Sequence, residues 1–476
     1  MVKQKHIYKL FIACGVGILS LASLSVIAGQ LDSSSLTIEK AIKTAQKNDP
    51  WLTGNIHKQK SLESMSTAVG TLPDPKISIG LANLPTNGFD FGQEGMTQAK
   101  IGITQMFPRG DKLDIQSEQL RIQSEAFPFQ RQDREAKVAV TVGTIWLDAY
   151  RVQESIALIE RNRSLFEQLI EVVDASYSSG LGKTRQQDLV RAQLELTRLE
   201  DRLEELEQQK SRFEGMLSQW LTVLSDNNAQ SDNIAISIHG LELSKQLPQI
   251  ELLNHELMQS KSWLMDKDLI LYFVNHPSII AIDKKIKATK TGIKLAEQKY
   301  KPEWGVTASY GYRADDPMGN SRADLFSIGV TFDLPIFTEN RQDQEVKSAI
   351  SETESVKTEK LLLLRQLLGA YSSAKGRLQR LQDRQILYRT KLLPQMHEQA
   401  EASLTAYTND DGDFSETVRS RISVLNAEID ELTLNVEQQK LHLELNYLFI
   451  GELNTTSLND MNATTSNPYA TGSGEK

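Results

Sequence analysis

The chain has almost no cysteine, and this limits the kinds of structural and catalytic site that it can form. Its 476 residues contain one cysteine, Cys14, inside an apolar segment near the start. A single thiol excludes a disulfide framework and a cysteine-rich structural metal site. If the leading segment is removed, the mature protein also lacks a cysteine nucleophile.

Long apolar runs and blocks of basic residues are also missing. After residue 28 no stretch of about eighteen uninterrupted apolar residues occurs. The richest run begins at Leu361 and is broken by Arg365. The sequence therefore excludes an α-helical inner-membrane transporter. The formal net charge is −9 without basic blocks, which argues against nucleic acid as a partner.

The first 28 residues have the layout of a secretory signal peptide. Lys3, Lys5 and Lys9 precede an apolar run that ends near Ala28, with small residues at the expected cleavage site. A retained transmembrane helix is the alternative. Lipid attachment at Cys14 is a weaker one, because most of the apolar run follows that residue.

The rest of the sequence contains an internal repeat. Pro50, Pro75 and Pro108 recur as Pro277, Pro302 and Pro335, a constant offset of 227 residues. A constant register over some sixty residues indicates one supersecondary unit used twice. We expect a first repeat at 29–225, a connecting segment at 226–267, a second repeat at 268–453 and a disordered tail at 454–476.

Each repeat contains two segments that alternate apolar and small or polar residues. They lie at about 75–83, 98–107, 302–313 and 324–334. In the third, Trp304, Val306 and Tyr310 alternate with residues such as Gly305 and Thr307. This period of two predicts strands, and about 9 to 11 residues suffice for a tilted strand to cross a membrane. A strand of a soluble sandwich is the alternative for any one segment.

Four strands cannot close a barrel, and an open sheet edge cannot face lipid. Unpaired backbone groups in a bilayer cost several kcal/mol each. Strands that span a membrane therefore require several chains. Three copies supply roughly a dozen strands, which enclose a pore.

Long helices are predicted at 111–222 and 340–450. Apolar residues recur there at steps of three and four, as in Leu189, Ala192, Leu196 and Leu199, which is typical of coiled coils. Proline interrupts helices, so we expect breaks near Pro128 and Pro394. The turns at 179–182 and 409–413 contain helix-breaking residues. The predicted fold class is mixed and mainly α, with coiled-coil hairpins and four transmembrane strands.

The sequence resembles the TolC family of outer-membrane efflux channels over about residues 36–452. The resemblance depends on the doubled layout, on LTIEKAIKTAQKNDP near the start, and on Tyr177-x-x-Gly180 followed by TRQQDLVRAQ. Within the family, LPDPKISIGLANLP and KIGITQMFPRGDK resemble the metal-cation efflux branch that includes CusC and CzcC.

The resemblance implies a homotrimer in outer-membrane lipid, with a twelve-stranded barrel continued by a periplasmic helical tunnel. It implies a periplasmic adaptor and an inner-membrane pump, of the RND type, as partners. Such a channel is a passive conduit, with no enzyme activity and no cofactor. Drug efflux and type I protein secretion are alternative roles, and a secreted structural coiled coil is an alternative of another class.

The predicted site residues lie at the two helix tips. The second repeat has Asp410, Asp411, Asp413 and Glu416, and the first has Lys183, Arg185 and Asp188. If several chains surround one axis, these carboxylates would form a ring that attracts cations. The basic residues could pair with the carboxylates and hold the channel closed. A solvated acidic turn is the alternative.

The family resemblance adds roles to three of these tip positions. It implies a gate-restraining role for Tyr407 and a constricting role for Asp188 and Glu416. Arg191 and Arg419 depart from the acidic family pattern at the next position. We find no catalytic set, and the spacing of histidines and methionines indicates packing and no metal site.

Overall fold

The structure is a computed structural model that describes residues 35–179, 185–222, 242–253, 266–409 and 412–451. The chain divides into a unit that ends at Ser35 and a second unit that begins at Leu36 and contains all the helices and strands that the structure describes. The predicted signal, the tail and most of the connecting segment lie outside the described residues. Among the described helices, none is long and apolar enough to cross a membrane.

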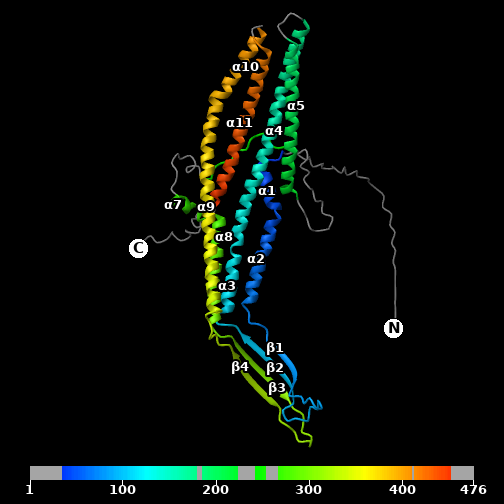
Figure 1. Cartoon of the computed structure of the whole chain (residues 1–476), viewed down its shortest axis with the longest axis vertical. Coiled ribbons are helices and arrows are strands. Elements are labelled where there is room, and N and C mark those ends of the chain that lie inside the picture. Colours follow the sequence, from blue (N-terminus) through cyan, green and yellow to red (C-terminus); the bar gives the residue numbers. More distant parts are fainter. Residues whose placement is uncertain (1–34, 180–184, 223–241, 254–265, 410–411, 452–476) are drawn as a thin grey trace, which may run out of the picture. The chain divides into compact units, whose positions relative to one another are not determined.

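The described elements occur twice in the same order (Figure 1). The first set comprises α1 (Ile38–Asn48), α2 (Pro50–Val69), β1 (Lys76–Ala82), β2 (Gln98–Phe107), α3 (Lys112–Ser124), α4 (Phe127–Ser179) and α5 (Gln186–Leu221). The second comprises α7 (Asp266–Phe273), α8 (Pro277–Glu297), β3 (Trp304–Tyr312), β4 (Leu325–Phe332), α9 (Gln342–Leu387), α10 (Leu393–Thr408) and α11 (Phe414–Leu448). The repeated prolines therefore mark equivalent elements.

The residues directly before Pro50 and Pro277 cap equivalent helices. Asp49 caps α2 through a 3.0 Å hydrogen bond from the Trp51 backbone N–H. His276 caps α8, where its Nδ1 accepts from the Ser278 backbone N–H at 3.3 Å. In both helices proline follows the cap, where its missing N–H costs nothing. Both copies of the repeat therefore encode a helix N-cap followed by proline.

The long helices are interrupted near the two prolines, as the sequence predicted. The first ends at Ser124 and resumes at Phe127, one residue before Pro128. The second changes to a π-helical turn at Tyr388–Leu392, and α10 then begins with Pro394 in its first turn. Each proline lacks the backbone donor that a continuous helix requires. The 53 residues of α4 still extend about 80 Å at about 1.5 Å per residue.

The four strands form one antiparallel sheet in the order β1-β2-β3-β4. The two hairpins meet through β2 and β3, whose register pairs Thr104 with Thr307 and Phe107 with Trp304. Within the described chain β1 pairs only with β2, and β4 only with β3. The sheet therefore ends in two open edges.

The edge strands are shorter than the sequence predicted. The strands have 7, 10, 9 and 8 residues in chain order, whereas about 9 to 11 were expected for each. β1 ends before Asn83, which has a φ of 56° that is incompatible with an extended strand. An edge strand also has a partner on one side only, so its ends lack the hydrogen bonds that extend β2 and β3.

Helices from both repeats pack together in three buried hydrophobic clusters. One surrounds Trp146 of α4 and includes residues of α1, α5 and α11. Another joins α7 and α9 to α11 around Tyr371 and Phe273. The third lies among α4, α5 and α11 and reaches Phe414 at the start of α11. Because α11 contributes to all three clusters, it joins the two repeats along its length.

Candidate functional site

Two helix tips lie at the end of the helices opposite the sheet, where α4 leads to α5 and α10 leads to α11 (Figure 1). They share one buried cluster, to which α4 contributes Val173, α5 contributes Ala192 and α11 contributes Phe414. Of the predicted site residues, the structure describes Arg185, Asp188, Tyr407, Asp413 and Glu416. Lys183, Asp410 and Asp411 lie outside the described residues.

Asp188 stabilises the start of α5, the helix that follows the first tip. It is buried, with 8% of its surface exposed, and its Oδ2 accepts a 2.9 Å hydrogen bond from the Arg185 backbone N–H. This bond closes the first turn of α5, which has Arg185 as its N-cap residue. The carboxylate of Asp188 is therefore engaged by the backbone, while the Arg185 side chain is exposed.

Asp413 stabilises the start of α11 at the second tip. It is the N-cap of α11, and its Oδ1 accepts from the Ser415 backbone N–H at 2.9 Å. That hydrogen bond lowers the pKa of the Asp413 carboxyl, and the charges of Arg191 and Arg185 lower it further. The two arginines belong to the first tip, so the fold brings acidic and basic predicted residues from the two repeats close together within one chain.

Glu416 lies in the first turn of α11 and forms an ion pair with Arg419 at 2.9 Å. Both side chains are largely exposed, at 45% and 69%. Exposed pairs of this kind contribute about 0 to 1 kcal/mol. Arg419 therefore partly neutralises the neighbouring acid.

Tyr407 packs within the tip, near the end of α10. Its ring lies 5.5 Å from that of Phe414, and it borders the shared cluster. A Cβ atom on Gly412 would lie 2.6 Å from the Tyr407 backbone nitrogen, so glycine is required for this turn. Tyr407 is therefore fixed by its ring on one side and by the backbone of the turn on the other.

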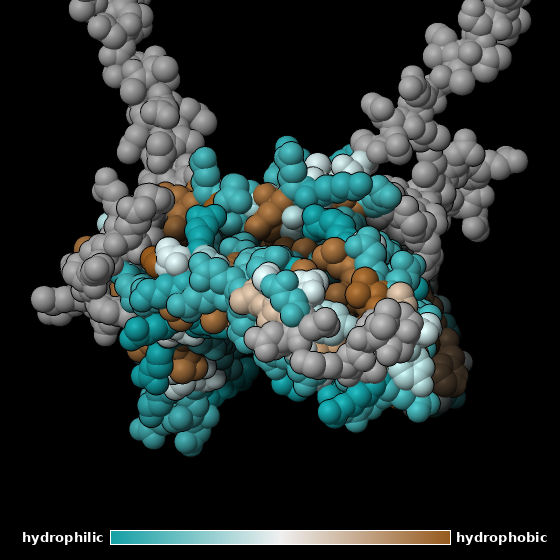
Figure 2. All heavy atoms as spheres, turned by 90° about the horizontal axis from the view of Figure 1, so that it is seen from above, coloured by the Kyte–Doolittle hydropathy of each residue, from teal (hydrophilic) through white to brown (hydrophobic). Residues whose placement is uncertain are grey.

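The surface at this end of the unit is mainly hydrophilic, with scattered hydrophobic side chains (Figure 2). Within the described ranges, no three His, Cys, Asp or Glu side chains are grouped so that they could hold a metal ion. The tip as described is a polar surface over a shared apolar core.

The sheet carries a second candidate surface, formed by its apolar side chains. Ile79 is 83% exposed, Ile328 and Ile77 are 70% exposed, and Phe326 is 68% exposed. A soluble sandwich strand would bury such a face, but none of the residues that the structure describes covers it. The alternate positions are mostly glycine, serine or threonine, and Thr104 and Thr307 bond through their hydroxyls at 3.0 Å. Large exposed apolar patches of this kind mark surfaces that contact a membrane or another protein.

A set of polar contacts joins the sheet to the helices. Arg109, which follows β2, pairs with Asp333 after β4 and donates to the Lys301 carbonyl oxygen at 3.1 Å. Lys301 in turn pairs with Asp111 at 3.0 Å. The tight turn here requires Gly110, which has a φ of 46°. These residues were not predicted as functional, although the basic Arg109-Gly110-Asp111-Lys112 run after a strand was a usable signal.

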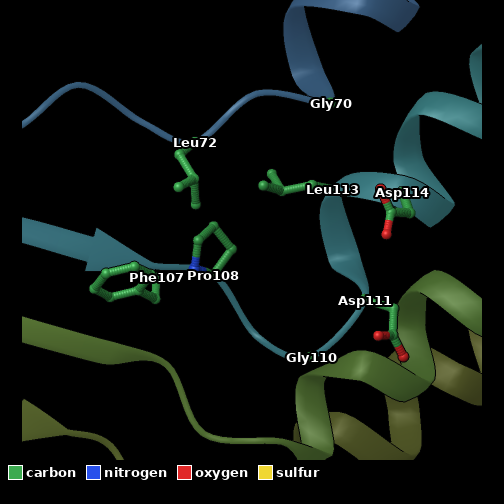
Figure 3. Close-up of a pocket in the computed structure, with 8 residues that line it drawn as sticks. All are labelled: Gly70, Leu72, Phe107, Pro108, Gly110, Asp111, Leu113 and Asp114. Carbon is green, nitrogen blue, oxygen red and sulfur yellow. The ribbon is translucent and has the colours of Figure 1, made fainter.

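Next to this junction is a cavity of about 300 Å³. Leu72, Pro108 and Leu113 point toward one another across it, and Asp111 and Asp114 lie at one side (Figure 3). Its lining is apolar and acidic.

A buried polar network links the repeats near the start of α8. His276 is fully buried, and its Nε2 lies 3.1 Å from the Tyr447 carbonyl oxygen. The Tyr447 hydroxyl donates to Asp133 at 2.9 Å, and Asp133 pairs with Lys137 at 2.6 Å. Burial lowers the pKa of His276 and raises that of Tyr447. Sequence reasoning assigned no functional role to His276.

Comparison with solved structures identifies the fold of this chain. Neither a protein-family profile nor a curated relative matches the sequence. Among solved structures, the chain is similar to CusC, which forms a transmembrane channel, with a TM-score of 0.67, 14% identity and coverage of 87% of this chain and 91% of CusC.

Two further structures give the same result. The CmeC outer-membrane channel of Campylobacter jejuni has a TM-score of 0.68 and 14% identity, with coverage of 91% of this chain and 90% of CmeC. The open MtrE outer-membrane channel of Neisseria gonorrhoeae has a TM-score of 0.63 and 14% identity, with coverage of 87% and 88%. The chain therefore has the fold of these outer-membrane channels, and the predicted resemblance to the TolC family is confirmed at the level of the fold.

Proposed function

We propose that this protein is the outer-membrane channel of a tripartite efflux system. The observation that carries the proposal is the four-stranded sheet, with one exposed apolar face and two open edges, attached to long helices of which α4 extends about 80 Å. Lipid covers the apolar face, and the edges β1 and β4 pair with neighbouring copies. Three chains then close a barrel of roughly a dozen strands.

The helices form the periplasmic part of the same conduit. The sheet and the helix tips lie at opposite ends of the described helices, so a membrane-embedded sheet places the tips far from the membrane. There they meet the periplasmic adaptor and an inner-membrane pump of the RND type. The channel is a passive conduit, and the pump supplies the energy. A secreted structural coiled coil would have no use for the exposed apolar sheet.

Metal cations are the proposed cargo. The support is the sequence resemblance to the metal-efflux branch, together with the acidic second tip. Asp413 and Glu416 lie there, and Asp410 and Asp411 are adjacent in sequence. Drug efflux and type I secretion remain the alternatives, since the pump and adaptor do most of the selecting.

Reconstitution into planar lipid bilayers tests the channel. We expect discrete conductance steps from the purified mature protein, and a trimer by mass measurement in detergent. A water-soluble monomer without conductance would refute the proposal.

The acidic tip is tested in the same bilayers. Replacement of Asp410, Asp411 and Asp413 by Asn should lower the preference for cations over anions, because a ring of fixed negative charge is lost. Asn retains the N-cap hydrogen bond of Asp413, so the tip should still fold. Unchanged ion selectivity would refute the role of these carboxylates.

A further inference from the structure

Three exposed apolar side chains lie just past the end of β4, where the chain returns to the helices. Leu334 is 64% exposed, Ile336 is 69% exposed and Phe337 is 91% exposed. Residues 334–337 are called the exit segment below. They adjoin an open edge of the sheet, because β4 pairs only with β3 among the described strands. Exposed apolar groups gathered in this way mark a contact surface.

The other open edge of the sheet adjoins a second partly apolar segment. Residues 71–75 lead from α2 into β1 and are called the entry segment below. Within it, Leu72 lines the cavity shown in Figure 3 and is still 52% exposed. Because all neighbouring strands are antiparallel, β1 begins at the end of the sheet where β4 finishes. If β4 of one copy pairs with β1 of the next, the exit segment meets the entry segment.

A junction of the same kind exists inside the chain, where β2 ends and β3 begins. The repeat offset of 227 residues relates residues 107–110 to the exit segment and residues 298–302 to the entry segment. In this in-chain junction, Arg109 donates to the carbonyl oxygens of Lys299 and Lys301 at 3.2 and 3.1 Å. The structure therefore shows once, within a single chain, how such segments lie against each other.

The repeat also predicts the register of the pairing between copies. Within the chain, Gln105 of β2 lies opposite Val306 of β3. The repeat offset converts this pair into Phe332 of β4 opposite Ile79 in β1 of the next copy. Both side chains belong to the apolar face of the sheet, with exposures of 51% and 83%. A shift by one residue would instead set apolar residues of one strand opposite small or polar residues of the other.

The sizes of the facing side chains differ between the two junctions in a complementary way. In the chain, a Cβ atom on Gly110 would collide with the Lys301 side chain, so a long residue on one side requires glycine on the other. The corresponding residues between copies are Phe337 in the exit segment and Asp74 in the entry segment. The shorter aspartate leaves room for the phenylalanine ring.

The polarity of the two junctions differs as well. Arg109 corresponds to Ile336, and Lys299, whose carbonyl oxygen Arg109 contacts, corresponds to Leu72. An arginine that binds backbone within the chain is thus replaced by isoleucine beside leucine between copies. Two exposed apolar side chains that face each other gain free energy when assembly removes them from water.

We infer that Ile336 and Phe337 of one copy pack on Leu72 and Asp74 of the next copy, where the sheet meets the helices. The inference rests on the proposed function, which supplies the pairing of β4 with β1. The occupant of each entry segment is a second copy of this chain, because the two segments continue the two edges that such a copy pairs.

Disulfide trapping in the full mature protein tests this contact. Cys14 is the only cysteine, so in a Cys14→Ala background the introduced cysteines have no competitor. Asp74→Cys/Phe337→Cys should give dimer and trimer bands in non-reducing electrophoresis after mild oxidation. Two strands separate β1 from β4, a distance of about 14 Å that no disulfide spans, so the bond must join two copies.

Two further cysteine pairs serve as controls. Ile79→Cys/Phe332→Cys tests the pairing of the strand edges alone and should also form dimers and trimers. Asp74→Cys/Leu361→Cys should form neither. Leu361 is as exposed as the exit segment, at 65%, but it lies about 28 Å along α9 from the start of that helix.

Removal of the apolar side chains should weaken assembly. By ultracentrifugation in detergent, Ile336→Ser/Phe337→Ser should raise the protein concentration at which half of the trimer dissociates at least about tenfold, because each interface buries less apolar surface. The matched control is Phe89→Ser/Met318→Ser. It removes two apolar side chains that are 68% and 91% exposed, in the loops at the other end of the sheet, and should assemble like the parent.

The outcomes separate this inference from the proposed function. Cross-linking of both the Asp74/Phe337 and the Ile79/Phe332 pairs, with weaker assembly of the exit-segment variant only, supports the inference. Cross-linking of the Ile79/Phe332 pair alone in a conducting trimer, or equal weakening by the loop control, overturns the inference and leaves the channel in place. A monomer without cross-links or conductance overturns both.

Discussion

A charge placed on the apolar face of the sheet should have very different effects in lipid and in water. Ile328 lies in the middle of β4 and is 70% exposed. If this face met water, Ile328→Lys would change stability by no more than about 0.5 kcal/mol. Near the centre of a bilayer, lysine costs about 2–4 kcal/mol. Three copies in a trimer would lose about 6–12 kcal/mol.

The matched control is Gly329→Lys, one residue further along the same strand. Its side chain would point to the opposite face, where a Cβ atom meets nothing within 4 Å. We expect it to cost little, because that face lines the aqueous pore in the proposed assembly. The two variants have the same added charge at the same depth.

Folding into phospholipid vesicles provides the assay. Heat-resistant electrophoretic mobility measures the folded fraction, and urea titration measures the free energy of unfolding. We expect the parent and Gly329→Lys to insert, and Ile328→Lys to insert poorly or to unfold at lower urea. Equal insertion and stability of the two lysine variants would refute the assignment of this face to lipid.

Three further predictions concern the helices. Gly412→Ala should destabilise the tip by about 1–3 kcal/mol, because the added Cβ atom contacts the Tyr407 backbone. Gly54→Ala should stabilise α2 by up to about 1 kcal/mol, because its Cβ atom meets no atom within 4 Å. Hydrogen exchange of peptides from the tip and from α2 measures both effects. Burial lowers the pKa of His276 from 6.5, so the stability that depends on its neutral form is present above pH 6.5 and declines below it. Urea midpoints should therefore fall less on acidification in His276→Asn than in the parent. Arg185→Ala should make the channel leakier if tip ion pairs hold it closed, and an unchanged closed-state conductance would exclude that lock.

Local chemistry made much of the fold predictable from the sequence. Period-two alternation identified all four strands, because a strand with two different faces must alternate. The constant proline offset identified the repeat, since Asp49-Pro50 and His276-Pro277 both encode helix starts. Pro128 indicated the break between α3 and α4 for the same local reason.

The candidate sites were less predictable, because their residues are distant in sequence. Asp413 was predicted as one carboxylate of a cation-attracting ring, and its proximity to Arg191 of the first tip depends on how the two repeats pack. Asp188 likewise proved buried. A cavity where α3 and α9 begin is lined by both Lys112 and Arg341, which are more than two hundred positions apart.

The sequence by itself determined the elements: amphipathic strands, long helices, their start signals and their duplication. Each of these follows from interactions over a few residues, which composition and spacing record directly. Only the tertiary structure decided that β2 pairs with β3, that no described residue covers the apolar face of the sheet, and that the segments after β2 and β4 line one cavity. Such contacts depend on packing between distant segments, and no local pattern encodes them.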